Sequence, residues 1–185
     1  MLEITVPQKE FWDPVKEEFL TVNKGTLQLE HSLISISKWE SKWHKPFYGK
    51  DPKTVEEIID YIKCMTIGKV SNPDIYISIA NSDTIIAQIQ EYIDNSMTAT
   101  WFSESKDGKG SSEVITSELV YYWMISFNIP FECEKWHFNR LLTLIRVCAE
   151  KNKPAKKQKS KDTAKTYAEI NAQRQAAWAA RKAKG

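Results

Sequence analysis

The chain has 185 residues, of which 42% are hydrophobic and 11% aromatic, as in globular proteins. This length fits one domain plus an appendage, and 6 Gly and 7 Pro argue against a large β-sandwich with many tight turns. The net charge of +2 conceals two opposite parts: residues 1–150 carry 15 Lys and Arg against 22 Asp and Glu, whereas residues 151–185 carry 11 against 2. The sequence therefore predicts an acidic body with a basic tail. This tail either binds nucleic acid or an acidic partner, folds back on the body, or only aids solubility.

The cysteines and the N-terminus indicate where the protein is expected to reside. Cys64, Cys133 and Cys148 are an odd number at wide spacing, which fits neither a disulfide framework nor a zinc pattern. A reducing compartment is therefore expected. The first ten residues lack the basic and apolar regions of a signal peptide, and no apolar run reaches the roughly 18–20 residues of a membrane span. We expect a protein of the cytosol in which it is made.

The N-terminal 29 residues alternate apolar and polar positions, a pattern typical of short strands. Strands are predicted over residues 2–6, 18–22 and 26–29. Phe11-Trp12-Asp13-Pro14 and Asn23-Lys24-Gly25 are predicted to be turns. Together these segments form a small antiparallel β element over about residues 2–29, which must lean on helices because three short strands alone are marginally stable.

Helical spacing of apolar residues begins after this element. Helices are predicted over residues 31–44, 55–67 and 84–94. Residues 74–80 alternate as a strand would, but their neighbours favour a helical turn, which we expect. Pro46 is expected to end the first of these helices. Thr54 and Glu57 are expected to form a capping box at the start of the second helix, and Gly68 is expected to end that helix. Residues 95–112 contain no such pattern, and their second half is expected to be a mobile surface loop.

Residues 115–150 are the most hydrophobic stretch, and we expect the rest of the chain to pack on them. Two helices separated by Asn128–Phe131 are predicted to form an αα-hairpin. The predicted face of the first helix contains Ile115, Leu119, Tyr122, Trp123 and Ser126, and that of the second contains Phe138, Leu141, Leu142, Ile145 and Cys148. The first helix is apolar nearly all round, so it is either buried or half covered by another chain.

The composition changes abruptly at Lys151. Residues 151–163 are Lys-rich without large apolar side chains and are predicted to be a flexible linker. Residues 164–184 have high helix propensity, with Tyr167 and Trp178 at helical spacing, and are predicted to be a helix that forms or docks on a partner. The fold prediction is thus mainly α: a compact helical domain over residues 1–150 with its small β element, and a basic, flexible or helical tail over residues 151–185.

Three groups of residues are candidates for chemical sites. Cys133 and His137 have i, i+4 spacing, but two ligands do not make a zinc site. Glu30-His31-Ser32 has the residue types of a catalytic triad, but sequence neighbours rarely assemble one. Gly108-Lys109-Gly110 resembles half a phosphate loop without the preceding strand. We therefore expect neither enzyme activity, nor a cofactor, nor a metal.

The basic tail remains as a candidate nucleic-acid contact. Its cations would track phosphates, but it has few aromatic residues and the acidic body opposes nucleic acid near the core. The basic residues singled out are Lys156, Lys157, Lys159, Lys161, Arg174 and Arg181.

Four blocks of the sequence carry a resemblance to a known family: residues 29–40 (LEHSLISISKWE), 57–66 (EIIDYIKCMT), 115–124 (ITSELVYYWM) and 136–148 (WHFNRLLTLIRVC). The chain resembles small proteins of long-tailed (siphovirus-type) bacteriophages, the tail-assembly chaperones made ahead of the tape-measure protein. The resemblance covers about residues 1–150 and includes the basic end.

This resemblance implies a non-catalytic protein of the host cytoplasm. It would bind the long helical tape-measure protein, self-associate, and help the tail-tube protein to polymerise. The aromatic side chains expected to contact partners are Trp39, Trp43, Trp123, Trp136, Tyr167 and Trp178. Two alternatives remain: a nucleic-acid-binding or anti-host regulatory phage protein that acts through its Lys-rich tail, and a structural minor tail or connector protein.

Overall fold

The computed structural model describes residues 1–13, 17–102, 114–153 and 169–174. The chain divides into two compact units, Met1–Glu150 and Lys151–Gly185. The first unit contains most of the helices and two small antiparallel sheets. A predominantly helical fold with an N-terminal antiparallel β element was predicted from the sequence, and the structure agrees with this outline.

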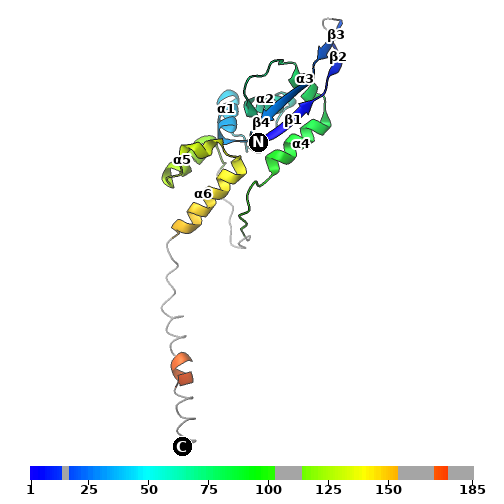
Figure 1. Cartoon of the computed structure of the whole chain (residues 1–185). Helices are drawn as coiled ribbons and strands as arrows, with labels where there is room; N and C mark the ends of the chain where they lie inside the picture. Colours follow the sequence, from blue (N-terminus) through cyan, green and yellow to red (C-terminus); the bar gives the residue numbers. More distant parts are fainter. Residues whose placement is uncertain (14–16, 103–113, 154–168, 175–185) are drawn as a thin grey trace, which may run out of the picture. The chain divides into compact units, whose positions relative to one another are not determined.

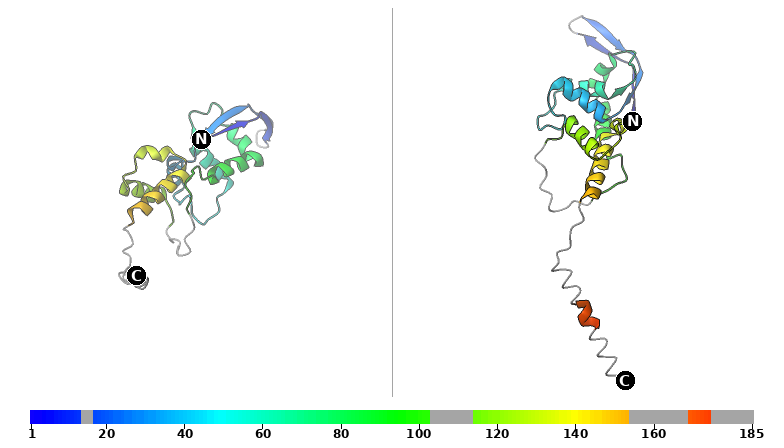
Figure 2. Two further views of the ribbon diagram at one scale, coloured as in Figure 1. Left: turned by 60° about the horizontal axis from the view of Figure 1, so that its bottom comes forward. Right: turned by 90° about the vertical axis from the view of Figure 1, so that its left-hand side faces the viewer.

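The N-terminal residues form one long hairpin that is bent in the middle of both arms. β1 (Leu2–Val6) pairs with β4 (Gly25–Leu29), and β2 (Lys9–Asp13) pairs with β3 (Glu18–Val22). Figures 1 and 2 show that the β2–β3 ladder stands away from the helices. β3 and β4 follow each other along one arm of the hairpin and are not paired with each other. The chain therefore does not reverse at residues 23–25, and the turn predicted there is wrong.

The predicted turn at residues 11–14 is also wrong over its first three residues, which belong to β2. The Asp-Pro signal is local, whereas pairing with β3 satisfies the backbone of the whole strand. Phe11 and Leu20 lie opposite each other in the register, and both pack against the core. These packing contacts favour extension of the strand through the position where the sequence predicted a turn.

Gly25 at the start of β4 allows another element to approach closely. A Cβ atom at this position would lie 2.6 Å from Cδ1 of Ile75 in α3 (Ile75–Ala80). Since Ile75 is buried, a side chain at residue 25 would require the end of the Ile75 side chain to shift within the core.

α1 (Leu33–Trp43) begins with a capping box in which Ser32 and Ser35 each bind the other's backbone N–H, at 3.3 and 2.9 Å. It ends before the predicted stop at Pro46, because His44 adopts a left-handed conformation with φ of 53° and donates its backbone N–H to the Glu40 carbonyl.

α2 (Val55–Met65) has the predicted capping box of Thr54 and Glu57, with distances of 2.7 and 3.3 Å. Its predicted end is wrong by two residues. Thr66–Ile67 forms β5, which pairs with β4 and makes the β1-β4-β5 sheet. This pairing depends on a distant strand, so helical spacing alone gave no sign of it.

The remaining helices follow the prediction in their positions. They are α3 (Ile75–Ala80), α4 (Asp83–Asp94), α5 (Ser117–Ser126) and α6 (Phe138–Asn152), and a 3₁₀ helix, η1 (Phe131–Lys135), lies between the last two. No helix in the described part of the chain is both long enough and apolar enough to cross a membrane.

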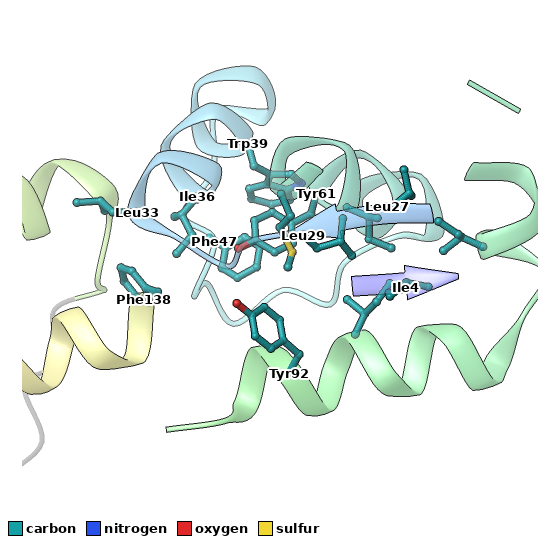
Figure 3. Close-up of a cluster of buried hydrophobic side chains, with 14 of the residues drawn as sticks. Ile4, Leu27, Leu29, Leu33, Ile36, Trp39, Phe47, Tyr61, Tyr92 and Phe138 are labelled. Carbon is teal, nitrogen blue, oxygen red and sulfur yellow. The ribbon is translucent and has the colours of Figure 1, made fainter. Parts of the chain in front are cut away.

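The core is centred on a different region from the one predicted. Figure 3 shows its side chains gathered among β1, β4, α1, α2 and α4, with Trp39, Tyr61 and Tyr92 converging there. α5 and α6 add Val120, Met124, Phe138, Leu141 and Ile145 to this cluster. Residues 115–150 therefore contribute side chains to a core that is centred on other elements. Part of their apolar surface remains exposed.

The buried side of α5 is not the face traced in its sequence. Its buried residues are Ser117, Val120 and Met124, whereas Tyr122 and Ser126, which belong to that traced face, are exposed. A helix that is apolar all round does not reveal from its sequence which side faces inward. α6 follows its prediction more closely, with Phe138, Leu141 and Ile145 buried and Leu142 and Cys148 half-buried.

Candidate partner-binding surface

α5 is held on α1 by a buried carboxylate. Glu40 of α1 accepts a hydrogen bond from the Ser117 backbone N–H at 2.8 Å and another from the Phe47 N–H at 2.7 Å. Charge-assisted hydrogen bonds of this kind are strong. Because Ser117 is the first residue of α5, this bond fixes the helix start and helps to set which side of α5 faces the core.

Away from the core, α5 exposes two large apolar side chains together with Glu118 and Ser126. Tyr122 is 63% exposed and Ile125 is 62% exposed, whereas Val120 and Met124 are fully buried. Single exposed apolar residues are common on protein surfaces, whereas two large ones three positions apart on one helix lie near each other and are candidates for a partner contact.

An apolar groove of about 360 Å³ lies between α5 and α6. Its walls include Trp123 and Phe127 on one side and Leu142 on the other. The closest helix neighbour of α5 is α1, so the predicted αα-hairpin is not a tightly packed helix pair. We call the groove together with Leu119, Tyr122 and Ile125 the α5 surface.

Two exposed arginines of α6 form cation–π contacts, and one of them, Arg146, lines the groove. The guanidinium of Arg146, which lines the groove, lies 4.1 Å from the centre of the Phe102 ring. The guanidinium of Arg140 lies 4.3 Å from the centre of the Trp136 ring. These cation–π contacts hold both arginines at the surface, where they are available to carboxylates of a partner.

The four tryptophans predicted to contact partners in residues 1–150 occupy different environments. Trp39 is fully buried, and its indole N–H donates to the Glu57 carbonyl at 2.9 Å, so a partner could not reach it without disrupting α1. Trp43 is half-buried and donates to Asp60 at 3.0 Å. Trp123 lines the groove, and Trp136 is half-buried under Arg140.

Little of the basic tail belongs to the described residues. Residues 169–174 are helical, and Arg174 is exposed there. The other tail positions predicted to contact partners lie outside the described residues: Lys156, Lys157, Lys159, Lys161, Tyr167, Trp178 and Arg181.

Two histidines meet in the interior. The His31 ring is fully buried and hydrogen-bonds to the hydroxyls of Tyr61 and, at 3.2 Å, Tyr48. The His137 ring lies 5.1 Å from it and contacts the Tyr92 carbonyl through Nε2 at 3.0 Å. Burial, with a smaller contribution from His137, lowers the pKa of His31 to about 3. Burial also lowers the pKa of His137.

This histidine cluster fastens α6 to the rest of the unit. The Phe138 backbone N–H donates to the His31 carbonyl at 2.7 Å, and Ser32 and His137 form an isolated antiparallel bridge. Asn139 donates to the carbonyls of Ile93 and Asn95 at 2.9 Å each. The start of α6, and with it one wall of the groove, is therefore tied to α1 and α4.

The three residues with the residue types of a triad do not act together. Glu30 accepts from the Tyr92 hydroxyl at 2.5 Å, Ser32 caps α1, and His31 faces tyrosines. Cys133 and His137 do not share a helix, since Cys133 lies in η1 and His137 follows that helix. Within the described ranges no three His, Cys, Asp or Glu side chains are grouped as metal ligands.

No family model, curated protein or solved structure matches the chain. A function is therefore inferred from the α5 surface and from the sequence. The sequence indicated that α5 is apolar all round and singled out Trp123, but it did not identify Ile125 as exposed. The sequence showed that α5 has more apolar residues than one buried face needs, but it did not show which of them are exposed.

Proposed function

We propose that the protein is a bacteriophage tail-assembly chaperone that binds the tape-measure protein and helps the tail-tube protein to polymerise. In this role it is non-catalytic and acts in the host cytoplasm. The observations that carry the proposal are the apolar groove lined by Trp123 and Phe127 and, on another side of α5, the side chains of Tyr122 and Ile125, which are more than 60% exposed. The resemblance of the sequence to tail-assembly chaperones supports it.

An amphipathic helix suits this surface. Such helices bind apolar grooves through side chains spaced at i, i+3, i+4 and i+7. The ring of Trp123 supplies an aromatic anchor in the groove, and Tyr122 extends the contact outward. Arg146 at the groove favours a partner helix that carries acidic residues beside its apolar stripe. A tape-measure protein, being long and helical, would offer many such segments to many copies of the chaperone.

Co-expression with the tape-measure protein, followed by size-exclusion chromatography with light scattering, tests the proposal. We expect a soluble complex with many copies of this chain for each partner. The double variant Tyr122→Asp/Ile125→Asp should abolish the complex, because it places two charges on the α5 surface. Val55→Asp is the matched control, since Val55 is 68% exposed on α2 and a charge there leaves the α5 surface intact. The proposal fails if the tape-measure protein precipitates alone, or if both variants bind equally well.

The charge of residues 151–185 supports a second candidate, a nucleic-acid-binding or regulatory phage protein. These residues carry 11 Lys and Arg against 2 Asp and Glu. Binding to DNA or RNA should then weaken steeply with salt and disappear when residues 151–185 are deleted. The chaperone role instead predicts that this deletion leaves binding at the α5 surface unchanged. A structural tail or connector protein, the third alternative, would be present in purified phage particles.

A further inference from the structure

A small hollow of about 210 Å³ lies beyond the end of α1, and Val114 forms part of its wall. Trp39, which has no exposed surface and lies in the inner wall, and the turn Pro46–Gly49 border it, and Lys45, Lys50 and Lys53 line it. Three lysines within nine residues of sequence thus line one concave site. Asp51 also lines the hollow and contributes an opposing carboxylate.

The loop that carries these lysines is fixed by hydrogen bonds. The Gly49 N–H donates to the Pro46 carbonyl at 3.1 Å, and the Phe47 N–H donates to the buried carboxylate of Glu40 at 2.7 Å. A Cβ atom on Gly49 would come within 3.1 Å of the Pro46 carbonyl oxygen, so the turn is tight. The capping box of Thr54 and Glu57 secures the other end of the loop. The lysines are therefore presented on an ordered frame, which lowers the entropic cost of binding a ligand.

The three ammonium groups are not equally neutralised. Lys45 forms an ion pair with Glu57. Lys53 donates to the Phe47 carbonyl at 2.6 Å and lies 4.2 Å from the centre of the Phe47 ring. Among the described residues, neither Lys50 nor Lys53 has a carboxylate within ion-pair distance. An ammonium has three donors, and the structure gives Lys53 one hydrogen-bond acceptor.

The environment of Lys53 indicates an excess of positive charge. Burial and the nearby Lys45 ammonium lower the pKa of Lys53, and Glu57 offsets this only in part. Burying a cation without an anion is unfavourable, and the two aromatic rings beside Lys53 compensate for part of this cost. An anion in the hollow would supply the missing partner and raise the pKa again.

We propose that this hollow binds a small oxyanion of the phosphate class, either inorganic phosphate or a phosphomonoester, through the ammonium groups of Lys50 and Lys53. A volume of about 210 Å³ accommodates a phosphate group and a small substituent. Lysine binds phosphate as a point charge, so the site selects charge and size more than shape. The proposal is independent of the chaperone role, since it uses neither α5 nor the groove.

The test titrates the full chain with inorganic phosphate and, separately, with glycerol 2-phosphate. Binding is followed by calorimetry and by the indole N–H resonance of Trp39 in NMR spectra. This resonance is assigned as the one that is missing from the spectrum of the Trp39→Phe variant. Because the Trp39 ring borders the hollow, its resonance reports this site and not the basic tail. We expect a saturable shift at one-to-one stoichiometry. A stronger response to glycerol 2-phosphate would identify a phosphomonoester as the preferred ligand. An equal response would show that the site recognises only the phosphate group and not its substituent.

Matched variants distinguish the site from general attraction to a cation-rich chain. Lys50→Met/Lys53→Met should weaken binding about tenfold or more. Lys156→Met/Lys157→Met removes the same charge from the tail and should leave the Trp39 shift unchanged. Asp51→Asn should strengthen binding, because it removes the opposing carboxylate. If the double variant at the hollow does not fold, the single change Lys50→Met gives the same comparison at an exposed position.

Two results would overturn the proposal. One is equal weakening by the hollow and tail variants, which would indicate diffuse electrostatic attraction. The other is the absence of a Trp39 shift at saturating phosphate while Asp51→Asn has no effect.

Discussion

α1 and α5 pack against each other, yet they use their apolar residues differently. In α1 the large apolar side chains Leu33, Ile36 and Trp39 are buried, and none is strongly exposed. In α5 the buried pair Val120 and Met124 is accompanied by the exposed pair Tyr122 and Ile125. The large apolar residues of α1 are largely used in the core, whereas α5 has more large apolar residues than it buries. The surplus on α5 marks the surface where we place the partner.

The largest expected effect is on the α1 side. Trp39→Ala should lower the free energy of unfolding by about 3–5 kcal/mol, because it removes a fully buried ring and its hydrogen bond to the Glu57 carbonyl. Trp43→Ala, at a half-buried position in the same helix, should cost clearly less. Urea unfolding followed by circular dichroism measures both. Equal losses would contradict the assignment of Trp39 as the central core residue.

On α5 the corresponding prediction concerns its buried side. Met124→Ala should lower the free energy of unfolding by about 2–5 kcal/mol, since the side chain is completely enclosed. The same denaturant experiment gives the value. A loss below about 0.5 kcal/mol would mean that α5 does not pack in the orientation described, and the α5 surface would then need to be reassigned.

Acid should destabilise the α1 side through His31. Its pKa is lowered from 6.5 to about 3 in the folded state, so the unfolded chain binds the proton more readily between these values. Stability should therefore be unaffected by this group above pH 6.5. Below that, the free energy of unfolding should fall by about 1.4 kcal/mol per pH unit, until the pH approaches 3.

Urea midpoints measured from pH 7 to pH 4.5 give this slope. His31→Gln should reduce the slope because the side chain no longer titrates, even though the variant is less stable at pH 7. His44→Gln is the control, since His44 is exposed and should leave the slope unchanged. A slope that is identical in the wild type and in His31→Gln would exclude His31 as its source.

The smallest expected effect on stability is on the outer side of α5. Tyr122→Ser and Ile125→Ser should each change the free energy of unfolding by no more than about 0.5 kcal/mol, because both side chains are mostly exposed. The same two variants should nevertheless lose the tape-measure partner. A large loss of stability would show that the residues serve the fold, and the contrast between α1 and α5 would disappear.

Local signals in the sequence were sufficient for several elements. The capping box of Thr54 and Glu57 correctly located the start of α2, because its hydrogen bonds form between residues three positions apart. The spacing of apolar residues likewise located α4 and α6. Non-local pairing was not accessible in this way. β5 exists because two residues after α2 meet β4, and β2 exists because β3 lies opposite it.

The candidate sites divide along the same line. The sequence singled out Trp123 and the over-apolar α5, and it revealed the charge difference between residues 1–150 and 151–185. It did not indicate that Lys45, Lys50 and Lys53 line one hollow, because their convergence depends on the turn Pro46–Gly49 and on the position of Trp39. It also suggested the residue types of a triad at residues 30–32, whose side chains turn to three different partners.

The sequence by itself determined the order of most elements, the helix starts with local caps and the opposite charges of the two parts of the chain. These follow from interactions between residues close in sequence, or from composition alone. Only the tertiary structure decided which side of α5 is buried, how the hairpin is paired and which residues form the core. Each of these depends on contacts between distant segments, such as the bond from the Ser117 N–H to Glu40, and the local pattern of residues does not encode them.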